Sequence, residues 1–153
     1  MTKPKILCTG APRSGTSLFN LLMSHFLDLK VHTEGGTPDK LFYECESFNQ
    51  PLNNWNTSNV TNMNFLFFKC SNFNQPLNNW NVSNVKNMNS MFHYCINFNQ
   101  NINNWNISNV IYMNYMFKQA YIFNQPLNNW NTSNVTNMDS MFSDASSFNQ
   151  PLN

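Results

Sequence analysis

The sequence predicts an α/β solenoid of 25-residue strand–helix units, preceded by a strand–loop–helix segment. Three observations lead to this prediction. Residues 48–147 can be written as four copies of one 25-residue pattern. Within each copy, an apolar stripe at helical spacing follows a short β-prone run. All four glycines and the single arginine, Arg13, precede residue 37, which indicates a boundary near Pro38.

The first unit, residues 1–37, is predicted to be a strand at 5–9 (KILCT), a loop at 10–17 (GAPRSGTS) and a helix at 18–27. The loop N–H groups and the helix N-terminus would point to one place, where an anion is favoured. Thr16 stands where a Walker A loop has lysine, and only four residues separate Cys8 from Arg13, unlike a phosphatase loop. The predicted phosphate-binding residues are Arg13, Ser14, Gly15, Thr16 and Ser17.

The stretch GAPRSGTSLFNLL resembles the 5′-phosphosulfate loop of sulfotransferases over roughly residues 3–30. The resemblance implies that Arg13 contacts the 5′-phosphate of the sulfate donor PAPS and that residues 14–17 add loop contacts. Sulfotransferases also bind the donor's 3′-phosphate through a second element with Arg and Ser, but no arginine follows Arg13. We therefore expect no enzyme activity and no cofactor. Residual binding of PAPS or phosphate at residues 10–17 is the alternative, and capping of the solenoid is a further use for the fragment.

The second unit, residues 38–153, contains a partial repeat, four full repeats over 48–147, and a partial repeat from Phe148. In one repeat, the L-x-x-W-x-V run at 77–82 predicts a short strand. Ser83 is placed as the N-cap of a short helix. The apolar stripe of that helix consists of Val85, Met88, Met91, Phe92 and Cys95. Since one such unit cannot bury its apolar face alone, the repeats must stack, with parallel strands on one side.

The repeated NNWNxSNVxxMxxMF core resembles the signature of the BspA-like leucine-rich repeat family, over about residues 39–153. The resemblance implies a leucine-rich-repeat solenoid for adhesion or protein binding, often at cell surfaces, without catalytic activity. The first apolar run of this chain is too short for a signal peptide or a membrane span. An intracellular location is therefore favoured over a surface one.

Two sets of positions also recur with the period of the repeat. Asn53, Asn54 and Asn56 and their equivalents are expected to stack as amide ladders between repeats. Another register is expected to hold small buried side chains, with disulfide or metal binding as the alternative; it contains Cys45, Cys70, Cys95, Ala120 and Ala145.

The variable positions predict where a partner binds. Aromatic and aliphatic residues at otherwise polar positions indicate a contact surface, unless they pack against neighbouring repeats. The predicted residues are Phe65, Phe68, Ile111, Tyr112, Tyr115 and Tyr121, with Ile122 beside them. The net charge of +1 and the lack of a basic run argue against nucleic acid.

The predicted function is a protein-interaction or scaffold module whose partner the sequence does not name. A phosphate binder and a self-assembling protein are the competing classes. Self-association would use the C-terminal end, where Leu152 and Asn153 stop partway through a repeat without a polar cap.

Overall fold

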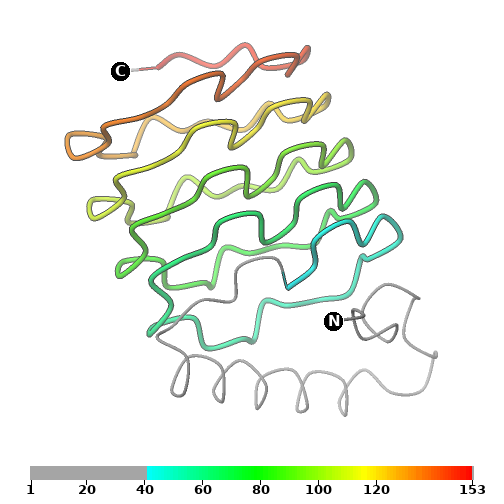
Figure 1. Cartoon of the computed structure of the whole chain (residues 1–153), viewed down its shortest axis with the longest axis horizontal. Helices are drawn as coiled ribbons and strands as arrows, with labels where there is room; N and C mark the ends of the chain where they lie inside the picture. Colours follow the sequence, from blue (N-terminus) through cyan, green and yellow to red (C-terminus); the bar gives the residue numbers. More distant parts are fainter. Residues whose placement is uncertain (1–40, 153) are drawn as a thin grey trace.

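The computed structural model describes residues 41–152, which form a stack of 25-residue coils (Figure 1). Residues at equivalent positions of the repeat lie one above the other, from the first coil to the last. The predicted α/β class is wrong, because residues 41–152 contain neither a helix nor an extended strand. Regular pairing is limited there to isolated parallel bridges that join Asn62, Asn87, Tyr112 and Asn137 in succession. The predicted strand–loop–helix of residues 1–37 lies outside the described residues.

The segment predicted as a helix is a run of overlapping turns. The N–H groups of Met91, His93 and Cys95 each donate to the carbonyl three residues earlier. The N–H groups between them donate instead to carbonyls of the next coil, as Phe92 does to Met116 at 3.0 Å. This alternation is incompatible with a helix, in which every N–H points along one axis to the fourth preceding carbonyl.

The predicted strand at residues 77–82 is also made of turns. The N–H of Trp80 donates to Leu77 O at 3.0 Å, and that of Val85 donates to Val82 O at 2.9 Å. Ser83 is not a helix cap, since its N–H donates to Asn81 Oδ1 at 3.1 Å in a local turn of the kind Asn favours. The coil therefore changes direction every few residues.

Positive φ angles recur at two registers of the coil. One register contains Phe65, Ser90, Tyr115 and Ser140, and the other contains Glu44, Lys69, Tyr94, Gln119 and Asp144, with φ between 52° and 62°. None of these residues is glycine, so each left-handed residue costs about 1–2 kcal/mol. Below the last coil, the N–H of each one donates to the next coil, which holds the backbone in this conformation.

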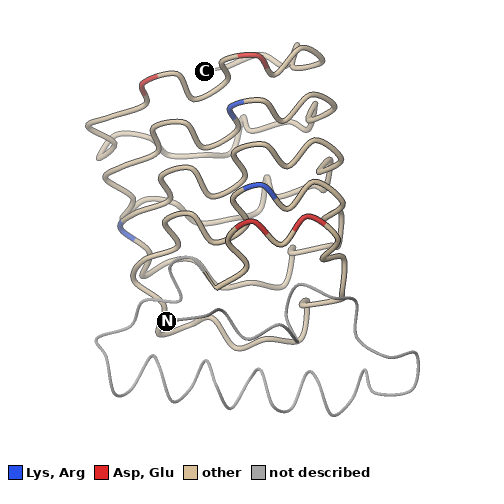
Figure 2. Cartoon of the chain, turned by 45° about the vertical axis from the view of Figure 1, so that its right-hand side comes forward, with Lys and Arg blue, Asp and Glu red and all other residues tan. Residues whose placement is uncertain are grey.

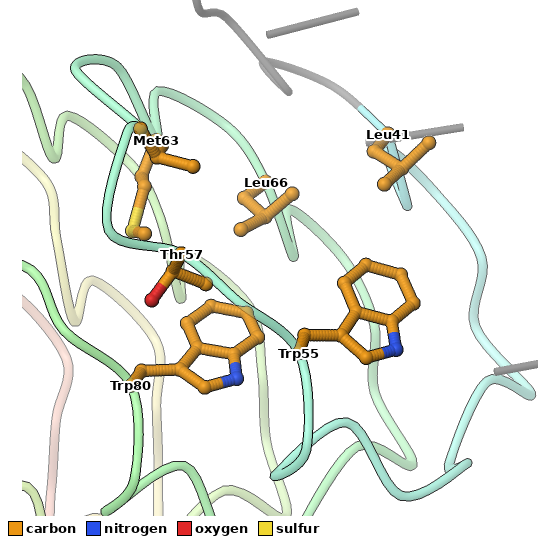
Figure 3. A pocket seen from close by; sticks show the side chains of 7 residues that line it. Leu41, Trp55, Thr57, Met63, Leu66 and Trp80 are labelled. Carbon is orange, nitrogen blue, oxygen red and sulfur yellow. The ribbon is translucent and has the colours of Figure 1, made fainter. Parts of the chain in front are cut away.

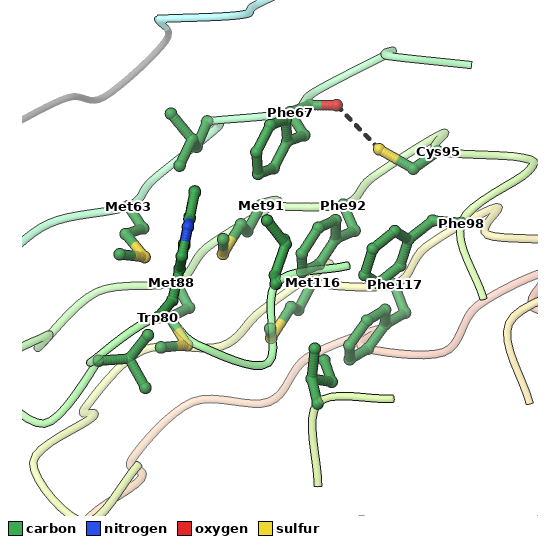
Figure 4. Close-up of a cluster of buried hydrophobic side chains, with 14 of the residues drawn as sticks. Met63, Phe67, Trp80, Met88, Met91, Phe92, Cys95, Phe98, Met116 and Phe117 are labelled. Atoms are coloured by element: carbon green, nitrogen blue, oxygen red, sulfur yellow. Dashed lines mark hydrogen bonds between the residues drawn. The ribbon is translucent and has the colours of Figure 1, made fainter. Parts of the chain in front are cut away.

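Two columns of phenylalanine rings form the centre of the core (Figure 4). In the first column, Phe67, Phe92 and Phe117 follow one another at centroid distances of 5.6 Å. In the second, Phe98 lies 4.0 Å from Phe92 within the same coil and 6.0 Å from the equivalent ring above. Such offset stacks add to the gain from burying the rings. Buried methionines of the M-x-x-M-F motif extend this core to one side.

The cysteine register is buried, as predicted, and its first member, Cys45, is disulfide-bonded, as the alternative had it. Cys70 and Cys95 are free thiols inside the core, and their Sγ atoms donate to Phe42 O and Phe67 O at 2.9 Å. Burial raises the pKa of Cys95 well above its usual value. Ala120 and Ala145 occupy the same register in the last two coils and are buried too.

Amide ladders do join the coils, although only some are at the predicted positions. Asn53 Oδ1 accepts the N–H of Asn79 at 3.1 Å, whereas Asn56 Oδ1 bonds within its own coil, to the N–H of Ser58. A stronger ladder lies in the Phe-Asn-Gln motif. There, each Asn Oδ1 accepts from the next coil both a backbone N–H and a Gln side chain, as Asn99 does from Asn124 and Gln125.

Candidate interaction surface

A row of rings follows the outer side of the turn segments across successive coils. Tyr43 stacks on Phe68 at a centroid distance of 4.7 Å, and the edge of His93 meets Phe68 at 4.9 Å. These three residues share one register. Phe65 and Tyr115 join from the neighbouring register, with Tyr115 6.5 Å from His93. We call these five residues the aromatic row.

The row is partly open to solvent. Phe65 packs edge-on against Tyr43 and Phe68, at 6.1 and 5.5 Å, so the two phenylalanines are half-buried by their neighbours. Tyr115 at the other end is 38% exposed. The buried partners of this segment, such as Phe67, point to the core instead. The row therefore lies on the surface of a packed coil.

Two lysines flank the row. Lys69 Nζ lies 5.3 Å from the centre of the Phe68 ring and Lys118 Nζ lies 5.5 Å from that of Tyr115, distances at which a cation is attracted to a ring face. Lys69 also bonds to Glu44 Oε1 at 3.1 Å, and this bond raises the pKa of Lys69. Lys118 has no ion-pair partner within residues 41–152. Charges are few elsewhere on the coils (Figure 2).

His93 sits in the middle of the row. Its Nε2 lies 3.4 Å from Gln119 Oε1, and its ring is wedged beside Phe68. Burial lowers the pKa of His93, and the nearby Lys118 and Lys69 lower it further, against a smaller raising effect of the Gln119 hydrogen bond. The ring is thus kept neutral at physiological pH.

The structure divides the residues predicted to bind a partner. Phe65, Phe68 and Tyr115 belong to the aromatic row. Tyr121 lies apart and contacts the ring of Tyr94 at 6.3 Å. Tyr112 is 45% exposed and belongs to the register of the parallel bridges. Ile111 beside it is half-buried, and Ile122, like Tyr121, is exposed. These four residues do not come together as one patch.

Four residues of this surface were not predicted from the sequence: Tyr43, Lys69, His93 and Lys118. The 25-residue period would have found them. Tyr43, Phe68, His93 and Lys118 are one register, and aligning outer positions by register shows a column of three rings ending in a cation. The predicted phosphate-binding residues, Arg13 to Ser17, lie outside the described residues.

The two ends of the stack differ from its side. At the first coil, Trp55 and Trp80 lie one beyond the other, with Leu41, Leu66, Met63 and Thr57 around them (Figure 3). The space between them is about 10 Å³, room for one water at most, and it is lined by apolar surface. It is therefore a packing gap and no ligand site. At the last coil, a cavity of about 110 Å³ opens beside Trp130 and Leu152.

Other kinds of site are not seen in the described part. Between residues 41 and 152, no three His, Cys, Asp or Glu side chains gather as a metal site would need. Over the same residues, no helix has the length and apolar character to cross a membrane.

These features define a repeat protein of stacked, turn-built coils with an aromatic row along one side. The chain belongs to the family described as "Mycoplasma protein of unknown function, DUF285", whose model matches residues 37–153. That span contains all of the repeats. Comparisons with curated proteins and with solved structures gave no match. The resemblances to BspA-like repeats and to sulfotransferases therefore stay predictions.

Proposed function

We propose that this protein is a non-catalytic interaction or scaffold module that binds a partner protein through the aromatic row. The observation that supports this most directly is the continuous contact between five surface rings and two lysines on successive coils. A few residues supply most of the binding energy in a protein interface, and tyrosine is one of the types enriched among them. A cation at a ring face adds an electrostatic attraction.

The scaffold supports the proposal because it fixes the row before a partner arrives. The backbone N–H groups of Phe65, Lys69 and Tyr115 donate to the next coil at 2.9 Å, so the segments that carry the rings are held on both sides. A preorganised surface loses little conformational entropy on binding. The resemblance to BspA-like repeats, which bind proteins, points to the same class of function.

Charge narrows the partner. Lys69 is neutralised by Glu44, but Lys118 beside Tyr115 has no acidic partner in residues 41–152. An acidic residue next to an apolar or aromatic side chain would satisfy both Lys118 and the Tyr115 ring. We therefore expect a partner segment in which a carboxylate and an apolar side chain are neighbours.

The test uses replacements that the repeats themselves contain. Serine occupies the register of Phe68 at position 143 and that of Tyr115 at position 90, so Phe68→Ser with Tyr115→Ser should leave the coil intact. Tyr112→Asn is the matched control, because it removes an equally exposed tyrosine outside the row and asparagine occupies its register elsewhere. Proteins retained on the immobilised full chain would be purified and titrated against all three forms.

We expect the double variant to lose about tenfold or more in affinity, as hot-spot residues do, and the control to bind like the parent. Equal affinity of the double variant and the parent would show that the row is not the binding surface. A loss in both variants would place the partner near Tyr112 instead.

The alternative function, residual PAPS or phosphate binding, rests on the GAPRSGTS stretch at residues 10–17. Its test is calorimetric titration of the full chain with PAPS and with its desulfated product. Arg13→Ala is the control. Micromolar binding that the control lacks would support this alternative, and the absence of heat would count against it.

A further inference from the structure

A groove lies between the coil of residues 73–97 and the coil of residues 98–122. Its volume is about 310 Å³, at the lower end of the range of about 300–1,000 Å³ for small-molecule sites. The residues that line it are Pro76, Asn78, Gln100, Asn101 and Asn104. None of these side chains is ionisable, and none belongs to the aromatic row. The groove is therefore lined by neutral, mainly amide groups and is separate from the proposed partner surface.

An amide ladder is interrupted at this groove. Like Asn53 in the first repeat, Asn103 accepts through Oδ1 the backbone N–H of an asparagine in the next coil, Asn129, at 3.0 Å. At the same register, Asn78 Oδ1 and the N–H of Asn104 find no partner among residues 41–152. The Asn104 side chain bridges the two coils instead, since its Nδ2 donates to Asn78 O at 2.7 Å. Asn78 is accordingly exposed, whereas Asn53 and Asn103 are half-buried.

The sequence departs from its repeat at the same place. Every other copy of the Phe-Asn-Gln motif is followed by proline, but Asn101 follows this one. Asn101 Oδ1 accepts the N–H of Asn103 at 3.0 Å, which fixes the side chain, and its Nδ2 has no partner within residues 41–152. Gln100 is fixed similarly, because its Nε2 donates to Asn74 Oδ1 at 2.9 Å while its Oε1 has no partner in the same span. Each of these two amides is therefore held at one end and open at the other.

The open groups of the groove include both donors and acceptors. The donors include Asn101 Nδ2 and the N–H of Asn104, and the acceptors include Asn78 Oδ1, Gln100 Oε1 and Asn104 Oδ1. An anion would use the donors alone and a cation the acceptors alone. A hydroxyl both donates and accepts, so neighbouring hydroxyls of one sugar ring can bond to groups of either kind. Pro76 adds apolar surface, on which the C–H groups of a sugar ring can be buried.

We propose that this groove binds one ring of a neutral glycan, through the amides of Asn78, Gln100, Asn101 and Asn104. A peptide fits the groove less well. Peptides that add along the edge of a protein use a regular row of backbone groups, with pockets for alternate side chains. Most of the open groups named above belong instead to side chains, and these amides are preorganised by their bonds to neighbouring residues. The proposal does not depend on the aromatic row.

The test is an NMR titration of the full chain, followed through the side-chain amide resonances of asparagine and glutamine. The probes are the methyl glycosides of glucose, galactose, mannose and N-acetylglucosamine. We expect saturable shifts with at least one of them and a millimolar dissociation constant, because each new hydrogen bond replaces one to water. Methyl glucuronide is the charged counterpart of methyl glucoside. It should bind no more tightly, since the lining residues named above include no cation to pair with its carboxylate.

Two variants locate the binding. Asn101→Pro introduces the residue that the other repeats have at this register and removes the Nδ2 donor. It should weaken binding about two- to tenfold, the net effect of one hydrogen bond. Asn104→Ala should weaken binding at least as much, since it removes Oδ1 and the bond that orients Asn78. Its matched control is Asn109→Ala, because Asn109 is also exposed and its Nδ2 donates to Ser83 O at the same distance of 2.7 Å, outside the groove.

Binding of a neutral sugar that is weaker in Asn101→Pro and Asn104→Ala but unchanged in Asn109→Ala would support the proposal. The lack of a saturable shift with every sugar at tens of millimolar would overturn it, as would tighter binding of the glucuronide than of the glucoside. Binding that both groove variants leave unchanged, or that Asn109→Ala weakens equally, would place the sugar elsewhere on the chain and overturn the proposal too. Calorimetric melting of each variant checks that it is folded.

Discussion

The buried indoles offer a sharp test of how hydrogen bonds stabilise the stack. Trp80, Trp105 and Trp130 each donate Nε1–H to a leucine or isoleucine carbonyl of the preceding coil, at 2.9–3.1 Å. Trp55 Nε1, in the first coil, is buried without a partner among residues 41–152. Trp55 and Trp105 are otherwise alike, at 5% and 3% exposure. Replacing each by phenylalanine removes the same atoms from similar surroundings but only one hydrogen bond.

The expected difference follows from these partners. In Trp105→Phe, one buried bond is lost, but Leu77 O still accepts the N–H of Trp80 at 3.0 Å, so the cost beyond lost packing is about 1 kcal/mol. In Trp55→Phe, an unsatisfied buried N–H disappears, which removes a penalty of about 1–3 kcal/mol. The free energy of unfolding should therefore fall by about 2–4 kcal/mol more in Trp105→Phe than in Trp55→Phe.

Calorimetric melting of the full chain measures this difference, at about 2–4 °C per kcal/mol for a protein of this size. Trp130→Phe controls for position, because Trp130 lies at the other end of the stack but has its bond. If fraying of the end coils alone explained a small destabilisation by Trp55→Phe, Trp130→Phe would lower the free energy of unfolding equally little. Equal destabilisation by Trp55→Phe and Trp105→Phe would refute the reasoning.

Two further predictions concern polar groups. Asn99 Oδ1 is half-buried and accepts from Asn124 and Gln125, whereas Asn106 Oδ1 is exposed and bonds to Ser108. Asn99→Ala should therefore lower the free energy of unfolding by about 1–2 kcal/mol more than Asn106→Ala. Urea unfolding of both variants measures this difference, and equal midpoints would contradict it. Burial lowers the pKa of His93, so the unfolded chain binds more protons than the folded protein near and below pH 6.5. The contribution of His93 to the free energy of unfolding should be complete above that pH and fall as the pH drops toward the folded pKa. His93→Phe, which carries the residue of Phe68 at the same register, should lose less stability between pH 7.5 and 5, and parallel pH profiles of the two proteins would contradict this.

The period of the repeat was enough to predict the stacking and much of the core. The predicted apolar stripe of Val85, Met88, Met91, Phe92 and Cys95 is buried throughout. A register that recurs in every repeat must meet the same environment in each coil, whatever the local backbone does. The phenylalanine of the Phe-Asn-Gln motif, which is fully buried as Phe73, Phe98 and Phe123, was not among the predicted core residues.

The helix was wrong because its apolar spacing has two interpretations. Positions 88, 91, 92 and 95 fit a helical face, but a chain of turns closed by bonds from residue i+3 to residue i returns to the same side just as often. The composition favoured turns. Asparagine is a poor helix former, and a helix of about ten residues has little stability of its own. Side-chain bonds such as Asn87 Oδ1 to the N–H of Asn89 compete with a helix directly.

The candidate surface was harder to predict because it depends on the left-handed residues. Phe65 and Lys69 have positive φ angles on either side of Phe68, and no glycine marks either place. A non-glycine residue keeps this conformation only if its surroundings hold it, and here the N–H bond to the next coil does so. At Ser140 and Asp144 the cost of positive φ is the same but that bond is missing among residues 41–152. Turn bonds within the coil, such as the one from the Ser143 N–H to Ser140 O at 3.1 Å, are present in the last coil too and hold the same conformation there.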